Sequence, residues 1–473
     1  MWNRWLSAGG LAVVLIAGVK CADCQEVLSH IDDRLVVHEW GTFTTFSGSN
    51  GVHLDFRPLR DQDLPDFVMN RASQSGHIWF GKGRIRTRVR METPVTYFYT
   101  EKERTVRASV EFPKGLLTEF YPPVAAMAPT FDSTKAFGVD GEPVGNSKLD
   151  WGEINLIPES SLAPGVNDRA TSEWLRGLLV ASVLPSAGDN HYIHARNTDS
   201  ALVHVRIPPA AKDGESPAFT AVPRGNYIEK FLFYRGVGKF DVPVKVSAEQ
   251  NDRIEIVNLG RHVLKHMLLL QVNGENRTYS MLPDVTPGQG TQTKAPAQAV
   301  SLDCLREIVC SELVDAGLYE KEAQAMVDTW TDSWFTEEGT RLFYFVPQEI
   351  TDSILPLTIT PEPDETLRVM VGRVEIMSAS REQRLLAAVL RSAKERADKA
   401  EQQKAVGTET AVELPVPPEF VALGRLAEPA LCRLREISTD RTAQIEVDCL
   451  IARMKADLAA EGKAAQLSAQ LHR

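Results

Sequence analysis

The stretch LVVHEWGTFTTFSGSNG, residues 35–51, decides the fold class because β-branched and aromatic residues surround a polar His-Glu pair. Such residues are enriched in β-strands. Neighbouring side chains of a strand point to opposite faces, so His38 and Trp40 share one face and Glu39 lies on the other. Gly41 is the natural place for a bulge. The stretch predicts a strand in which Glu39 is paired internally, because a carboxylate on an apolar face needs a partner.

The composition is that of a globular protein. The chain has 473 residues, of which 43% are hydrophobic and 24% charged, and these fractions are ordinary for folded domains. The formal net charge of −11 argues against a nucleic-acid-binding protein, whose surface would be basic. The same charge disfavours general adhesion to anionic membranes.

The N-terminus predicts a signal peptide over residues 1–24. Arg4 precedes the apolar run LAVVLIAGV, residues 11–19, which is too short to span a bilayer as a helix. We therefore expect an exported chain, periplasmic or extracellular, with no transmembrane span in its mature part. The alternative is an apolar N-terminus that is not cleaved.

The hydrophobic pattern predicts a mainly β protein with antiparallel, sandwich-like sheets, helical segments and a C-terminal helical unit, which is α+β overall. Short alternating strands dominate residues 25–295, in one sandwich or two, with an irregular insertion at 121–190. Residues 296–380 mix helix and strand. Residues 381–473 are helical, with a linker near 406–417.

Three local predictions accompany this division. TPVTYFYT (93–100) and TVRASVEF (105–112) read as one hairpin, and HYIHAR (191–196) with ALVHVRIP (201–208) as another. In ETLRVMVGRVEIM (365–377), a glycine interrupts the alternation and predicts a bulge.

Five segments together resemble a family of uncharacterised exported bacterial proteins: VHEWGTFTTFSGSNG, METPVTYFY, EKFLFYRGVG, WFTEEGTRLFYFVP and LGRLAEPAL. The resemblance covers most of the mature chain. It implies export, and it implies no activity, cofactor or site residue.

A row of arginines occurs in GKGRIRTRVRME, residues 81–92. Arg84, Arg86, Arg88 and Arg90 alternate with other residues, so one strand would present cations about 7 Å apart. Guanidinium groups bind carboxylates bidentately, and the row is therefore a candidate for binding an anionic glycan or a carboxylate-bearing ligand. The alternative is a cross-strand ladder with Asp and Glu.

Three carboxylates are candidate catalytic groups: Glu39, Glu92 and Glu229. A glycosidase needs two carboxylates roughly 5–10 Å apart across a cleft. Glu229 and Arg235 share a strand face, which also suits a structural ion pair. The test is whether Glu39, Glu92 and the arginine row converge in one pocket.

No metal site or cofactor is predicted. His194 with His204, and His262 with His266, are pairs without an identifiable third ligand. The sequence contains no Gly-rich phosphate loop and no GxSxG motif. Aromatic residues near Glu337 and Glu338 suit either a sugar platform or the core: Trp330, Trp334 and Phe335.

The cysteines suggest one disulfide. Cys432 and Cys449 lie in two predicted helices joined by STDRT, and an antiparallel hairpin would bring them opposite each other. Cys304 and Cys310 are on one helix, about 9 Å apart along its axis, and cannot bridge each other. The pairing of Cys24, Cys304 and Cys310 stays open.

These observations favour an exported binding or cell-envelope scaffold protein. Its partner would be an anionic glycan, a carboxylate ligand or an envelope protein. The alternative is a hydrolase, possibly directed at glycans, that uses carboxylates near an Arg-lined cleft.

Overall fold

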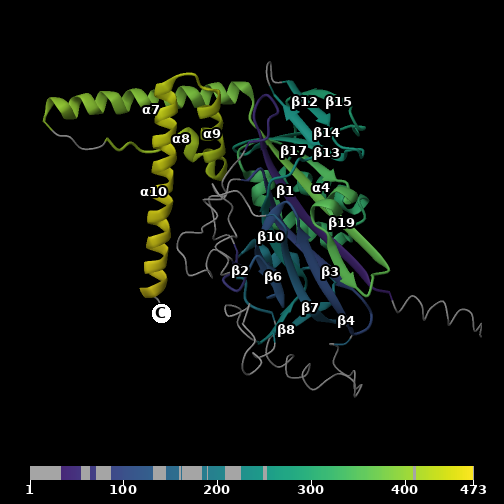
Figure 1. The fold of residues 1–473 in the computed structure, drawn as a ribbon. Helices are drawn as coiled ribbons and strands as arrows, with labels where there is room; N and C mark the ends of the chain where they lie inside the picture. The colour runs from purple at the N-terminus through teal and green to yellow at the C-terminus, as the bar shows by residue number, and fades with distance from the viewer. Residues whose placement is uncertain are drawn as a thin grey trace, which may run out of the picture.

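The computed structural model describes residues 34–54, 64–70, 87–130, 145–158, 161, 184–188, 190–207, 225–248, 253–407 and 412–471. The predicted signal peptide, residues 1–24, lies outside this part of the chain. Strands form the body of the molecule, and the C-terminal helices extend from one end of it (Figure 1). The mainly β, α+β class is confirmed.

Ten of the described strands form one large sheet. Its order is β16 (Gln298–Ala299), β14 (Asn276–Leu282), β13 (Lys265–Asn273), β17 (Gly339–Val346), β19 (Glu365–Ile376), β1 (Val36–Ser47), β3 (Val89–Tyr99), β10 (Leu232–Gly238), β5 (Gly115–Tyr121) and β2 (Met69–Asn70). Strands from the sequence segments 25–295 and 296–380 therefore share one sheet.

The opening stretch forms β1 at the centre of this sheet. All twelve residues of β1 are buried. β1 runs parallel to β19, while the other neighbouring strands of the described sheets pair antiparallel. Its register with β3 shifts between Trp40 and Thr42, so the bulge predicted at Gly41 is confirmed.

Two smaller sheets pack on one face of the large sheet. One has the order β18 (Leu357–Thr360), β4 (Arg104–Phe112), β7 (Ser147–Ile157), β8 (Leu202–Ile207) and β9 (Gly225–Glu229), with β6 (Ala126–Ala128) beside β7. The other contains β11 (Val244–Ser247), β12 (Arg253–Asn258) and β15 (Gly290–Lys294). The main core lies between these layers, with Phe43, Trp151 and Ile256 among its buried residues.

Helices cover the opposite face of the large sheet. α4 (Leu302–Asp315), α5 (Glu320–Thr331) and the π-helical turn η6 (Asp332–Thr336) bury a second core that includes Trp40. Trp334 and Phe335 are fully buried and Trp330 is 5% exposed. These aromatic residues are therefore core residues rather than a sugar platform.

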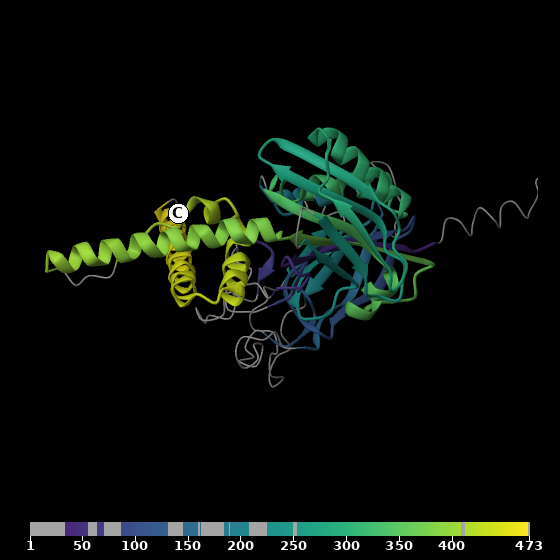
Figure 2. The ribbon, with the colours of Figure 1, turned by 90° about the horizontal axis from the view of Figure 1, so that it is seen from above.

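The C-terminal helices form a third core. They are α7 (Ala379–Ala405), α8 (Pro418–Val421), η7 (Gly424–Leu426), α9 (Ala427–Ile437) and α10 (Arg441–Leu471). α7 starts where β19 ends and runs away from the sheets (Figure 2). Phe46, Leu54 and Met377 from the body join this core, so the helices pack against the end of the large sheet.

Two of the local predictions are wrong. β3 and β4 lie in different sheets and do not form a hairpin. Residues 191–196 form a 3₁₀ helix, η5 (His191–Arg196), instead of a strand. β3 and β4 both contain buried residues, and their partner strands are distant in sequence. In η5 only Tyr192 and Ala195 are buried, and Ile193 is 44% exposed.

Gly372 is also not a bulge. It stays in continuous register with Phe43 on β1 and Tyr344 on β17. A Cβ at Gly372 would lie 2.2 Å from Cε1 of Tyr344. The glycine therefore makes room for a tyrosine ring that crosses it.

No helix in the described part of the chain combines the length and the hydrophobicity needed to cross a membrane.

Candidate functional site

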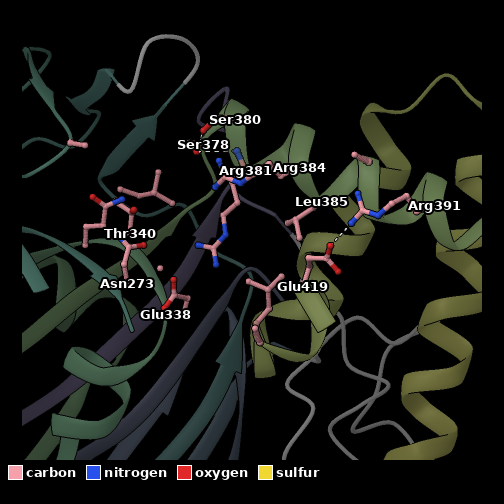
Figure 3. A pocket seen from close by; sticks show the side chains of 17 residues that line it. Asn273, Glu338, Thr340, Ser378, Ser380, Arg381, Arg384, Leu385, Arg391 and Glu419 are labelled. Atoms are coloured by element: carbon pink, nitrogen blue, oxygen red, sulfur yellow. Dashed lines mark hydrogen bonds and ion pairs between the residues drawn. The ribbon is translucent and has the colours of Figure 1, made fainter. Parts of the chain in front are cut away.

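The candidate site is a cavity of about 610 Å³ between the end of the large sheet and the C-terminal helices (Figure 3). Strands β13, β17 and β19 provide one wall, and α7 with the α8 region provides the other. The polar and charged lining residues are Gln271, Asn273, Glu338, Thr340, Ser378, Ser380, Arg381, Arg384, Arg391 and Glu419.

Arg381 is the central cation of the cavity. It lies in the first turn of α7, and its side chain reaches into the cavity between Glu338 and Glu419 (Figure 3). Its guanidinium makes no ion pair within 4.0 Å with any residue that the structure describes. Burial lowers the pKa of Arg381, whereas Glu375 and Glu338 act in the opposite direction. The charge is thus partly desolvated and incompletely compensated.

A buried charge cluster lies next to Arg381. Arg341 Nε is 3.0 Å from Glu375 Oε1. Arg373 Nη2 is 2.5 Å from the same oxygen and 2.7 Å from Glu337 Oε2. These two arginines and two carboxylates balance one another in charge. Arg381 makes no ion pair with this cluster, and the carboxylates that act on it electrostatically are Glu375 and Glu338.

Gly339 allows this close approach of guanidinium groups. Its φ is +145°, and a Cβ there would lie 3.2 Å from Arg341 Nη2 and 3.3 Å from Arg381 Nη1. Any side chain at this position would crowd both arginines. The absence of a side chain at Gly339 thus lets Arg381 of the cavity lie close to Arg341 of the buried cluster.

Two more arginines follow along α7. Arg384 lines the cavity and is exposed, and Arg391 pairs with Glu419 from α8. Arg381, Arg384 and Arg391 are three and seven residues apart in turn, a spacing that places them along one side of a helix. The site therefore contains a row of three arginines, of which Arg381 is the least exposed to solvent.

The start of α7 adds a weaker positive potential. Ser378 caps the helix, with its Oγ accepting from Arg381 N at 3.3 Å, and Ser378 Oγ lies 3.0 Å from Ser380 Oγ. Unpaired N–H groups at a helix N-terminus attract anions. The helix terminus and Arg381 therefore favour the same kind of ligand.

The potentially reactive groups in the lining of this cavity are few and locally engaged. Its described lining contains no histidine or cysteine. Glu338 Oε2 accepts from Gly274 N at 2.9 Å, and Glu419 is paired with Arg391. Both lining carboxylates are thus held in local interactions.

Glu39, the first candidate carboxylate, is fully buried and has a complete set of partners. Arg368 Nε donates to Oε2 at 2.7 Å. Thr96 and Tyr234 donate to Oε1 at 2.9 and 2.5 Å. The prediction of internal pairing is confirmed, and Glu39 is closed off from substrate.

Glu92 and Glu229 are locally paired as well. Glu92 is 1% exposed and accepts from Thr44 Oγ1 at 2.7 Å, with Arg90 Nε 3.1 Å away. Glu229 is fully buried and pairs with Arg196 Nη2 at 2.7 Å. Glu39, Glu92 and Glu229 do not line the Arg381 cavity, and the hydrolase alternative stays a prediction.

The structure describes only two of the four arginines in the row. Arg84 and Arg86 lie outside the described residues. Arg90 is 5% exposed and pairs with Glu92, as the ladder alternative predicts. Arg88 lines a different cavity. Among the described residues, the row and the three carboxylates therefore do not converge in one pocket.

The predicted helical hairpin around STDRT is confirmed by α9 and α10. Cys432 is on the exposed side of α9 and Cys449 is half-buried on α10, and the structure joins neither thiol to another described cysteine. The Cys432–Cys449 disulfide stays a prediction.

The two histidine pairs are placed differently in the structure. Among the described residues, no group of three or more His, Cys, Asp or Glu side chains is arranged to hold a metal ion. His194 is exposed on η5, and His204 is buried on β8 with Asn226 Oδ1 3.1 Å from its Nε2. His262 and His266 do line one common cavity.

Sequence reasoning missed the arginines of α7. The signal lies in SASREQRLLAAVLR, residues 378–391. A serine cap is followed by an arginine in the first turn, where a cation opposes the helix dipole. Such a residue is unfavourable for the helix alone, which indicates another role.

Comparisons with known proteins identify no family. No family model matches the chain, and no curated protein matches it. The chain is similar to the Fcho1 Mu homology domain of Danio rerio with bound Eps15 peptide, with a TM-score of 0.29 and 8% identity over 73% of this chain and 98% of that chain. For the yeast delta-COP-I mu-homology domain the TM-score is 0.22 and the identity 7%, over 73% and 96%. Likenesses this low carry no argument about function.

Proposed function

We propose that this protein is an exported binding module that holds a small carboxylate-bearing molecule in the Arg381 cavity. The observation that carries this proposal is the partly buried Arg381 guanidinium, which points into the cavity without an ion-pair partner among the described residues. Burying an uncompensated charge is costly, so a ligand that neutralises it gains binding free energy.

The ligand class follows from the groups around the cavity. A guanidinium binds a carboxylate through two parallel hydrogen bonds, and Arg384 offers a second cation nearer to solvent. Asn273 and Thr340 add polar groups, and Leu385 adds an apolar one. A volume of about 610 Å³ is within the range for small-molecule sites. A polar organic acid fits this combination.

Isothermal titration calorimetry tests the proposal with glucuronate and citrate as probes and glucose as the uncharged comparison. We expect both acids to bind and glucose not to bind. Arg381→Gln should weaken binding of the acids about 10- to 100-fold, the effect of losing a charged hydrogen-bonding group. Arg253→Gln, at an exposed position on β12, should leave binding unchanged.

The contrary results are equally clear. Binding of glucose as tight as that of glucuronate would show that charge is not recognised. If Arg381→Gln bound glucuronate and citrate as tightly as the natural protein does, these acids would not bind at Arg381. Inorganic phosphate as a third probe distinguishes a carboxylate site from a general oxyanion site.

Export is the second part of the proposal. It is supported by Arg4 and the apolar run at 11–19, a pattern typical of cleaved signal peptides. N-terminal sequencing of the protein from fractionated cells should give a mature chain starting near residues 22–25. An intact Met1 in the cytosolic fraction would contradict it.

A further inference from the structure

Two adjoining cavities form a groove on another part of the molecule. Their volumes are about 600 and 750 Å³, and both are lined by Arg261, His262 and Glu349. The residues between β12 and β13 provide one side of this groove, and α6 (Gln348–Ile354) provides part of the other. The groove shares no lining residue with the Arg381 cavity, so it is an independent site.

The groove is basic on a chain whose net charge is −11. Its lining cations include Arg88, Arg261 and Lys265, whereas the acidic residues that line it are Asp241 and Glu349. Arg368 also lines it but is neutralised by Glu39. The imidazoles of His53, His262 and His266 complete the lining.

Arg261 and Lys265 are the cations available to a ligand. Both side chains are exposed, and neither makes an ion pair with the described residues. His262 Nδ1 lies 3.7 Å from Glu349 Oε2, whose side chain is 69% exposed. The cations of this groove are therefore only partly balanced by its acidic groups, which favours an acidic ligand.

Apolar side chains also line this groove. Leu259 is 62% exposed and Val52 is 48% exposed, and both line the groove. Phe240, Pro243 and Ile350 lie in the same lining. Exposed apolar residues gathered at one concave site mark a place of interaction.

The backbone at one end of the groove is held in an unusual conformation. His266 has a φ of +51°, and the register of β13 with β17 shifts beside it. Its Nδ1 lies 2.6 Å from Glu312 Oε2, and its ring stacks on Phe345 at 4.7 Å. Non-glycine residues in this conformation are often found at functional sites. The imidazole is fixed in place, so this end of the groove is preorganised.

We propose that the groove docks an extended acidic segment of a partner protein, in which apolar side chains alternate with carboxylates. Charge complementarity selects acidic groups near Arg261 and Lys265. Leu259 and Val52 select apolar side chains, which an acidic polysaccharide lacks. Two connected cavities suit an extended segment because its alternate side chains enter them in succession.

Fluorescence anisotropy of the full chain tests this with a labelled synthetic peptide of alternating leucine and glutamate. We expect saturable binding that weakens with salt. The double variant Arg261→Glu/Lys265→Glu should bind at least about tenfold more weakly, because like charges would then face each other. The control Lys394→Glu/Lys404→Glu makes the same charge change at exposed positions of α7 and should bind as the natural protein does.

Three further measurements separate the causes. Leu259→Ala should weaken binding severalfold without changing its salt dependence, and circular dichroism checks that each variant is folded. Arg261→Gln should weaken binding less than the double variant does. A leucine–lysine peptide should not bind.

The proposal is overturned if the α7 control loses as much affinity as the groove variant, or if the leucine–lysine peptide binds equally well. Polyglutamate binding as tightly as the leucine–glutamate peptide would show attraction without docking. Polygalacturonate binding more tightly, with the same dependence on Arg261, would assign the groove to a polysaccharide instead.

Discussion

Arg368 and Glu39 are register partners on the parallel strands β19 and β1, and they form a buried ion pair with Nη2 2.6 Å from Oε2. Both side chains are nearly inaccessible, with 1% and 0% exposure. Tyr234 also donates to Glu39, and burial raises the pKa of its phenol. The pair therefore links three strands and leaves the carboxylate with no open position.

Replacing Glu39 with Ala should destabilise the protein by about 3–5 kcal/mol, because the Arg368 charge would stay buried without its partner. Urea unfolding followed by circular dichroism measures this. Glu365→Ala is the matched control on the same strand pair. Its partner Arg34 is 51% exposed, so we expect a loss of at most about 1 kcal/mol. Equal losses would mean that burial does not decide the effect.

Gly372→Ala should cost about 1–3 kcal/mol, as overpacking does in a dense core. The new Cβ would meet Tyr344 at 2.2 Å from Cε1. Thermal unfolding measures the loss. In the double variant Gly372→Ala/Tyr344→Leu, the glycine substitution should cost less than in the natural protein, because the ring is absent. Strict additivity would contradict this account of the glycine.

His53 should make the protein less stable as the pH falls. Burial lowers its pKa from the ordinary value of 6.5, and Arg88 acts in the same direction. The unfolded chain then binds a proton more readily than the folded one, so stability is full above pH 6.5 and decreases from there through the lowered pKa. In unfolding experiments at pH 7 and 5, His53→Gln should lose less stability than the natural protein. His194→Gln, at an exposed position, should behave as the natural protein does.

The pairing of Cys432 with Cys449 is directly measurable. Peptide mapping under non-reducing conditions should find the two joined if the α9–α10 hairpin is crosslinked in an oxidising compartment. We then expect Cys432→Ser to lower the melting temperature only of protein kept oxidised. Peptides that carry both thiols reduced, from protein purified without reductant, would rule the bond out.

The sequence indicated β1, its bulge and the internal partner of Glu39, because these depend on alternation and on the cost of burying charge. It did not indicate that β3 and β4 separate, since a short connection fits a hairpin as well as a crossing between sheets. The sequence also did not indicate which strand pairs with β1. Parallel pairing with β19 depends on surfaces that meet only after the sheet assembles.

The candidate site was missed for a related reason. Arg381 is an ordinary residue of a polar helix until β17 and its Gly339 lie beside it. The arginine row was predicted as a binding site because its period of two is a local feature of the sequence. In the structure Arg90 pairs with Glu92, two residues away. Local periodicity predicts elements well, whereas a cavity depends on which elements become neighbours.

The separation of Glu39 and Arg368 by 329 residues also concerns the order in which the molecule can be made. Strand β1 emerges first from the ribosome but gains its parallel neighbour only when most of the chain has been synthesised. Until then a central strand with twelve buried positions stays open to wrong partners, and such long-range pairing is slow. A fragment that stops before residue 365 should therefore aggregate or bind holding chaperones, whereas the complete chain folds alone.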